Sequence, residues 1–155
     1  MTKRETIRVG LFSAYLPLYN ALCAELPECW QPYWGLRTFA QQDSLYAQGR
    51  TQPGRIITNA RGGQSAHNYG CATDWTLWDD KGKPIWLTQD DPRWIEYMAA
   101  LNKVGLRWGG DFPTPDKFHN EIKLNPKTDW ILVQKEFIAK DLKASYDLIS
   151  KNVVV

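Results

Sequence analysis

Apolar residues recur at helical spacing near the start of the chain, between residues 7 and 26. Pro17 lies inside this stretch, which predicts either a kinked helix or two short helices. A further helix is predicted to begin after Thr38, because Thr38 and Gln41 have the spacing of a capping box. Gly49 is expected to end that helix, since glycine adopts the backbone conformation that closes many helices.

The middle of the chain has the alternation and turn residues of strands. Strands are predicted over residues 71–78 and 83–87, joined by the turn at residues 79–82, whose two aspartates leave a cation site open as an alternative. Residues 118–124 alternate in the same way and predict another strand.

Two more helices are predicted in the second half. Asp91 and Pro92 are typical of a helix start, and Gly105 of its end. Asn125 and Pro126 are expected to open one last helix that runs to about residue 149. Because helices and hairpin-linked strands fall in separate groups, the sequence predicts an α+β fold, a small antiparallel sheet flanked by helices.

Composition narrows the class of protein. A length of 155 residues, with 43% hydrophobic and 23% charged residues, indicates one globular domain over residues 1–155. No apolar run approaches the roughly 20 residues of a membrane span, and the first apolar stretch is interpreted as a helix rather than a signal peptide. The net charge of +2 is too small to indicate a nucleic-acid partner. Three scattered cysteines exclude a disulfide scaffold and a cysteine-rich zinc site.

The chain has only two histidines, and both have carboxylates at useful spacing. His67 precedes Asp74 by seven residues, while His119 follows Asp116 by three and precedes Glu121 by two. Two imidazoles and a carboxylate can hold zinc and leave a fourth position to water. A second carboxylate would then move protons. Taken singly, each of these residues has an ordinary structural interpretation, such as a hydrogen-bonded loop histidine or a turn aspartate.

Residues 65–74, with the sequence SAHNYGCATD, fit the pattern S-x-H-x-x-G-x-A-x-D. This pattern resembles that of the zinc D-alanyl-D-alanine carboxypeptidase and L-alanyl-D-glutamate endopeptidase family, which includes VanY-like enzymes. Residues 35–50 resemble the family's G-x-R-S/T…Q…L-Y-x-x-G-R region. Residues 105–112, GLRWGGDF, resemble the G-L-x-W-G-G-D-W segment of its phage endolysin branch.

The resemblance implies a hedgehog/DD-peptidase-like single domain with one Zn²⁺. The zinc ligands that it implies are His67, Asp74 and His119. By the same resemblance Asp116 is the catalytic acid and base, and Arg37 is the cation that stabilises the oxyanion. Ser65 and Arg50 are expected to bind substrate. The family often has P-H-F around its last histidine, and because Phe118 and Asn120 stand here instead, Glu121 and Asp111 remain alternative bases.

The expected function is hydrolysis of peptidoglycan stem peptides, at the L-alanyl-D-glutamate bond, by a monomeric phage-type endolysin without a separate wall-binding domain. Such a protein would be made in the host cytoplasm without a signal peptide and would act on the wall in the periplasm after the membrane is permeabilised. A D-alanyl-D-alanine carboxypeptidase and a non-catalytic wall-peptide binding module remain alternatives. A cysteine hydrolase that uses Cys71 is a third, disfavoured because Cys71 occupies a variable position of the motif.

Overall fold

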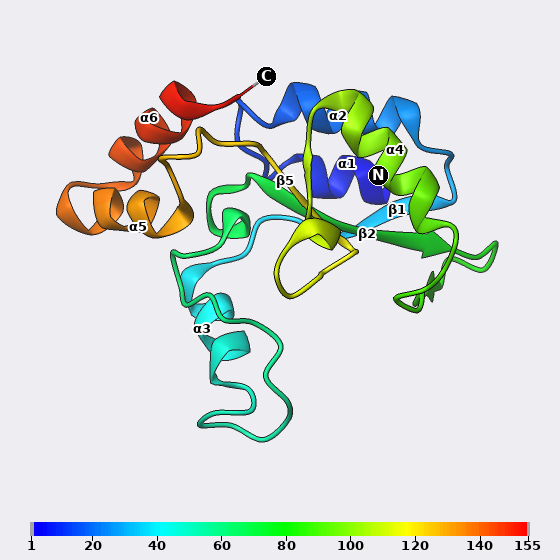
Figure 1. Ribbon diagram of the computed structural model, residues 1–155, viewed down its shortest axis with the longest axis horizontal. Coiled ribbons are helices and arrows are strands. Elements are labelled where there is room, and N and C mark those ends of the chain that lie inside the picture. The colour runs from blue at the N-terminus through cyan, green and yellow to red at the C-terminus, as the bar shows by residue number, and fades with distance from the viewer. Residues whose placement is uncertain (1, 155) are drawn as a thin grey trace.

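A five-stranded antiparallel sheet forms the centre of the computed structural model, which describes residues 2–154 (Figure 1). Its strands are β1 (Trp30–Trp34), β2 (Ala72–Trp78), β3 (Pro84–Ile85), β4 (Arg107–Trp108) and β5 (His119–Glu121). The order across the sheet is β1-β2-β5-β4, and β3 pairs with the other end of β2. The predicted α+β class with a small antiparallel sheet is confirmed.

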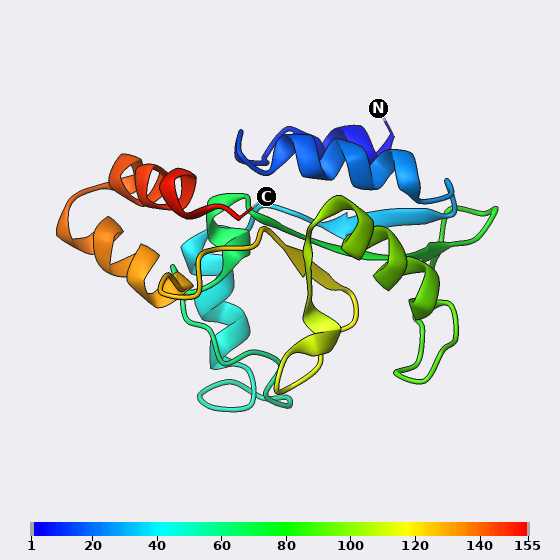
Figure 2. The same ribbon diagram turned by 45° about the horizontal axis from the view of Figure 1, so that its top comes forward.

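Six helices surround this sheet. They are α1 (Lys3–Arg8), α2 (Leu16–Glu25), α3 (Phe39–Ala47), α4 (Trp94–Val104), α5 (Trp130–Ala139) and α6 (Leu142–Asn152). Two short 3₁₀ turns, η1 (Ala66–Tyr69) and η2 (Gly109–Asp111), flank the candidate site. In both views α1 and α2 lie on one side of the sheet and α3 lies on the other, while α5 and α6 pack together at one end (Figure 2).

The helix signals at the start of the chain are confirmed. The apolar stretch forms two helices, and Pro17 lies in the first turn of α2, where its missing N–H costs nothing. The capping box of α3 is present, because Gln41 N–H donates to Thr38 Oγ1 at 3.1 Å and Thr38 N–H donates to Gln41 Oε1 at 2.8 Å.

Two predictions about the second half were wrong. The single helix expected from Asn125 to about residue 149 is divided into α5 and α6, because the Asp141 side chain accepts from Ala144 N–H and starts a new helix. The strand expected over residues 118–124 is reduced to the three residues of β5, since its pairing with β2 ends at the pair Ala72 and Glu121. Just before β2, Gly70 turns the chain with a positive φ of 65°.

A fully buried polar network joins β2 to β5 on the face of the sheet that α2 and α4 cover. Tyr15 Oη lies 2.7 Å from Thr73 Oγ1, and Asn120 Nδ2 donates to the Thr73 carbonyl at 3.0 Å and to a tyrosine hydroxyl of α4 at 2.7 Å. Since neighbouring side chains on a strand point to opposite faces, this network lies directly behind Asp74 and His119.

Across residues 2–154 we find no helix with both the length and the apolar character that a membrane crossing requires.

Candidate active site

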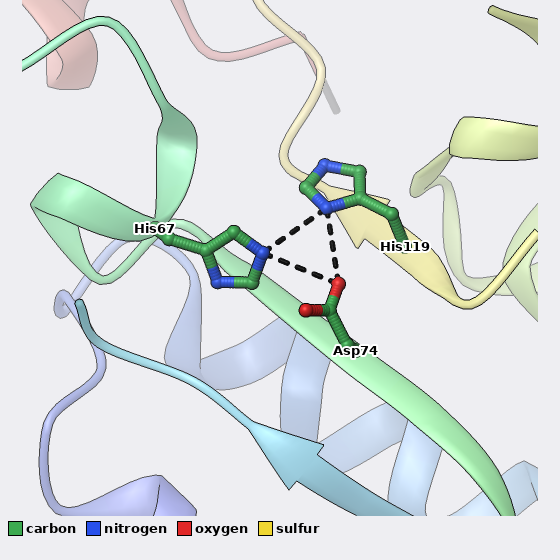
Figure 3. Close-up of side chains that lie close together, drawn as sticks. All are labelled: His67, Asp74 and His119. Atoms are coloured by element: carbon green, nitrogen blue, oxygen red, sulfur yellow. Dashed lines mark hydrogen bonds and ion pairs between the residues drawn. The ribbon is translucent and has the colours of Figure 1, made fainter. Parts of the chain in front are cut away.

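Three elements bring the candidate metal ligands together. His67 lies on η1, Asp74 on β2 and His119 on β5, where Asp74 and His119 are directly paired across the two strands. The turn that presents His67 is fixed by Asn68, whose side-chain oxygen accepts from Gly63 N–H at 2.9 Å. The close-up shows the three side chains pointing toward one another (Figure 3).

The ligand atoms form a nearly equilateral triangle. Asp74 Oδ1 lies 3.2 Å from His67 Nε2 and 3.2 Å from His119 Nδ1, and the two nitrogens are 3.1 Å apart. The other nitrogen of each ring faces an acceptor, since His67 Nδ1 is 2.7 Å from the Gly35 carbonyl and His119 Nε2 is 3.0 Å from Glu121 Oε2. In neutral rings those outer nitrogens carry the protons, so three lone pairs converge on one point.

This arrangement fits a zinc ion. With bonds of about 2.0–2.1 Å in tetrahedral geometry, ligand atoms lie about 3.3 Å apart, close to the 3.1–3.2 Å found here. All three residues are buried, with exposed fractions of 3–7%. Two nitrogens and one carboxylate oxygen match the donors that zinc prefers, and the set leaves the fourth position open.

The three side chains of the cluster shift one another's pKa values. Burial lowers the pKa of His119, but hydrogen bonds to Asp74 and Glu121 outweigh it and raise that pKa well above its usual value. Burial also raises the pKa of Asp74, but His67 and His119 outweigh it and hold the carboxyl well below its usual range. A metal ion must therefore displace a proton from the site.

Asp116 lies on the loop between η2 and β5, where its backbone is tied to the site. Its N–H donates to the Gly109 carbonyl at 2.9 Å, and its carbonyl accepts from His119 N–H at 3.2 Å. Desolvation and then the charge of Asp74 raise the pKa of Asp116, while His119 and His67 act in the opposite direction. Asp116 is an exposed residue, and a role for its carboxyl as the proton carrier stays a prediction.

Because Gly109 has no side chain, the backbone of the loop that carries Asp116 can lie directly against it. A Cβ at position 109 would lie 2.3 Å from the Asp116 carbonyl oxygen and 2.9 Å from the His119 Cβ. A side chain at position 109 would push the Asp116 segment away from His119. The W-G-G stretch therefore allows this segment to pack beside the candidate ligand.

Arg37 reaches the site from the loop between β1 and α3. Its guanidinium lies 3.7 Å from Asp74 Oδ2 and donates to Gln42 Oε1 at 2.8 Å. Gln42 is fully buried, and its amide also donates to the Ala60 carbonyl at 2.8 Å. Sequence reasoning assigned Gln41 to the cap of α3 and missed Gln42, because only the folded chain shows which of the two glutamines faces the arginine.

Tyr33 is a second residue that sequence reasoning missed. It lies at an irregularity between Pro32 and Trp34, where β1 shifts its register against β2, and such irregularities redirect side chains. Its ring packs edge-on against Phe118 and Trp86, with centroids 6.1 and 5.1 Å away. Burial and then the charges of Asp74 and Asp116 raise the pKa of Tyr33, so its hydroxyl keeps its proton beside the site.

The proposed substrate residues Ser65 and Arg50 lie on the segments that surround α3 and η1. Ser65 directly precedes η1, and its N–H donates to Asn68 Oδ1 at 3.4 Å. Arg50 donates to the Tyr46 and Thr58 carbonyls at 2.7 and 3.0 Å, and these bonds hold the loop after α3. Substrate contact by Ser65 or Arg50 stays a prediction.

The alternative bases and the alternative nucleophile are placed differently. Glu121 bonds the outer nitrogen of His119 and a guanidinium nitrogen of Arg107, so it faces away from the point where the lone pairs meet. Asp111 lies exposed on η2. Cys71 is fully buried, and burial raises the pKa of its thiol, which keeps it protonated and a poor nucleophile.

Comparison with known proteins agrees with this geometry. Residues 58–122 match the family described as D-alanyl-D-alanine carboxypeptidase, and this segment contains the three candidate ligands and Asp116. The match covers 65 of the 155 residues. The chain is also 44% identical, over 84 residues, to the peptidoglycan L-alanyl-D-glutamate endopeptidase CwlK of Bacillus subtilis (strain 168). That alignment covers 50% of each protein, so the chain spans about half the length of this relative.

A solved structure shares the fold. The Serratia marcescens L-Ala D-Glu endopeptidase ChiX superposes with a TM-score of 0.54 at 20% sequence identity. The match covers 79% of this chain and 87% of ChiX, so it extends beyond the family segment to most of the sheet and its helices.

Proposed function

We propose that this protein is a zinc peptidase that hydrolyses the L-alanyl-D-glutamate bond in peptidoglycan stem peptides. The observation that carries the proposal is the convergence of His67 Nε2, Asp74 Oδ1 and His119 Nδ1, with the Arg37 guanidinium 3.7 Å from Asp74 Oδ2. The choice of bond is supported by the 44% identity to a relative that bears this activity in its name.

Zinc, when bound to the three ligands, supplies a Lewis acid that polarises the scissile carbonyl and makes water more acidic. Asp116 accepts a proton from the attacking water as its oxygen bonds to the carbonyl carbon. The carbon–nitrogen bond then breaks, and Asp116 delivers the proton to the leaving amine of D-glutamate. The guanidinium of Arg37, held by Gln42, faces the oxygen on which negative charge develops.

The substrate carries carboxylates, and arginine recognises carboxylates with two parallel hydrogen bonds. We assign recognition of the stem peptide to the rim formed by Ser65 and the loop that Arg50 stabilises. Arg50 already makes three hydrogen bonds within that loop, including one to Asn59 Oδ1 at 2.9 Å. Its contribution to binding therefore includes keeping the loop in place.

Mass spectrometry of purified peptidoglycan, after incubation with the zinc-loaded protein, tests the proposal. We expect new D-glutamate amino termini, with L-alanine left on the glycan. The matched control is Asp116→Asn, which should retain one zinc per chain while its kcat falls by about 10²–10⁴-fold, the usual contribution of a general base. Release of D-alanine instead would make the protein a carboxypeptidase, and zinc binding without any cleavage would make it a wall-peptide binding module.

We also propose that the chain acts as an endolysin and that its catalytic domain is monomeric. The support is the likeness of residues 105–112 to the endolysin segment and the single hydrophobic core that the described residues share. Expression in the cytoplasm of a Gram-negative host tests the role, because lysis should begin only when a membrane-permeabilising agent is added. Lysis that never follows permeabilisation would contradict it.

A further inference from the structure

Glu121 is the most enclosed carboxylate beside the ligand cluster that no step of the proposed reaction uses. It is 5% exposed, and both of its oxygens are engaged. Oε2 lies 3.0 Å from His119 Nε2, and Oε1 accepts a hydrogen bond of 3.0 Å from Arg107. Arg107 stands directly opposite Glu121 in the pairing of β4 with β5, so the two strands hold this ion pair behind the histidine.

The two candidate histidine ligands are supported by different groups. His67 faces a neutral acceptor, the Gly35 carbonyl at 2.7 Å, whereas His119 faces a carboxylate. A carboxylate holds an imidazole N–H more strongly than a carbonyl does and makes the opposite nitrogen a better donor to a metal. The support of His119 is therefore the stronger of the two and depends on one charged side chain.

We propose that Glu121 and Arg107 form a positioning pair that fixes His119 with its proton on Nε2 and its lone pair on Nδ1, and thereby sets how tightly the protein retains zinc. This inference rests on the zinc site of the proposed function. If the proton moved to Nδ1, the ring would offer no lone pair to the point where His67 and Asp74 converge. A buried carboxylate prevents this exchange, because Nε2 without its proton would leave two acceptors facing each other.

Arg107 has two functions in this arrangement. It balances the buried negative charge of Glu121, which would otherwise be costly. Its guanidinium also lies over the Phe112 ring, 4.5 Å from the centroid, and that ring lies 5.5 Å from the His119 ring. Glu121 therefore restrains the ring through its nitrogen, and Arg107 and Phe112 restrain it from the side.

Zinc affinity of the full chain, measured by competition with a chromophoric chelator, tests the inference without any peptidoglycan. The variants are Glu121→Leu, which removes the acceptor, Glu121→Gln, which keeps a neutral acceptor, and Arg107→Gln. We expect zinc to bind about 10–100-fold more weakly to Glu121→Leu, the usual effect of losing such a partner, with smaller losses in the other two. The matched control is Glu25→Gln, which breaks the exposed ion pair with Lys103 and should leave affinity unchanged.

A second readout separates positioning from simple loss of packing. In the zinc-loaded protein labelled with ¹⁵N-histidine, the His119 Nε2–H should give a downfield proton resonance that exchanges slowly with water. The resonance should exchange faster in Arg107→Gln and disappear in Glu121→Leu. If Glu121→Leu does not fold, Glu121→Gln decides, and its affinity should fall at least threefold.

Unchanged zinc affinity in a folded Glu121→Leu or, failing that, in Glu121→Gln would overturn the inference, as would assignment of the proton to Nδ1 of His119. Neither result depends on hydrolysis. A protein that binds zinc as expected but cuts no peptidoglycan would contradict the proposed function and leave the positioning pair intact.

Discussion

Replacing Gly109 with alanine tests the position of the loop that carries Asp116, with zinc content as the check on His119, whose Cβ the new side chain would also approach to 2.9 Å. The new Cβ would lie 2.3 Å from the Asp116 carbonyl oxygen, whereas ordinary contacts begin near 3.4 Å. The difference requires the loop to move by about 1 Å. A misplacement of this size can cost on the order of 10²-fold in rate, while overpacking costs about 1–3 kcal/mol of stability. We therefore expect kcat/KM to fall about 100-fold and the protein to remain folded.

The assay measures kcat/KM on a soluble muropeptide by chromatography, with zinc content determined on the same samples. The matched control is Gly82→Ala in the turn before β3, where a Cβ would meet nothing within 4 Å. Gly82 has a positive φ of 71°, so alanine there costs stability without touching the site. If Gly109→Ala keeps kcat/KM within threefold of wild type at equal zinc content, the contact does not position Asp116 and the argument fails.

Three further predictions concern the metal, the arginine and the proton carrier. Removing zinc with a chelator should lower Tm by roughly 10 °C. Free zinc at 1,000 times its Kd adds about 4 kcal/mol to the free energy of unfolding, and each kcal/mol raises Tm by about 2–4 °C. Equal Tm values for the zinc-loaded and zinc-free protein, measured by calorimetry, would contradict this prediction. Gln42→Leu removes the hydrogen-bond acceptor of the Arg37 guanidinium and the donor to the Ala60 carbonyl, while the ion pair of Arg37 with Asp74 remains. Urea unfolding should therefore show a loss of about 1–3 kcal/mol, together with a lower kcat, whereas an unchanged midpoint would refute the role of Gln42. Asp116 must be ionised to accept a proton, and its pKa is raised above the ordinary 3.8 of aspartate. In the pH profile of kcat/KM, the loss of activity toward acidic pH should therefore have its midpoint above pH 3.8, and this midpoint should move in Asp116→Glu. A midpoint at or below 3.8 would show that another group carries the proton.

Local signals predicted the parts of the fold that depend on short stretches of chain. The capping box at Thr38 and the end of α4 at Gly105 are such cases, because a side chain or a glycine a few residues away is enough to form them. The break between α5 and α6 was missed, although Asp141 is a good cap. An aspartate inside a long helical pattern does not reveal whether the chain turns there, because that depends on how the two helices pack.

The sequence predicted the site residues that belong to a motif. It did not predict the orientation of residues that only the tertiary fold brings to the site. The spacing of His67 and Asp74 pointed to one cluster, and strand alternation correctly placed Glu121 on the same face as His119. Alternation does not say which nitrogen of the ring faces the metal, so Glu121 remained a possible base until the structure placed it behind His119. The position of Tyr33 could not be predicted for a related reason. The register of β1 shifts between Pro32 and Trp34, so the alternation of side chains along the strand does not show to which face Tyr33 points.

The distribution of the ligands along the chain determines the order in which the protein can acquire its metal. His67 and Asp74 are seven residues apart, but His119 lies 45 residues beyond Asp74 and reaches them only when β5 pairs with β2. During synthesis on the ribosome, a chain that ends before β5 holds just two of the three ligands and so has little affinity for zinc. The complete zinc site therefore forms only when these two strands pair. Asn120 lies next to His119 on β5, so the pairing of β5 with β2 completes both the three-ligand cluster and the buried network of Tyr15, Thr73 and Asn120.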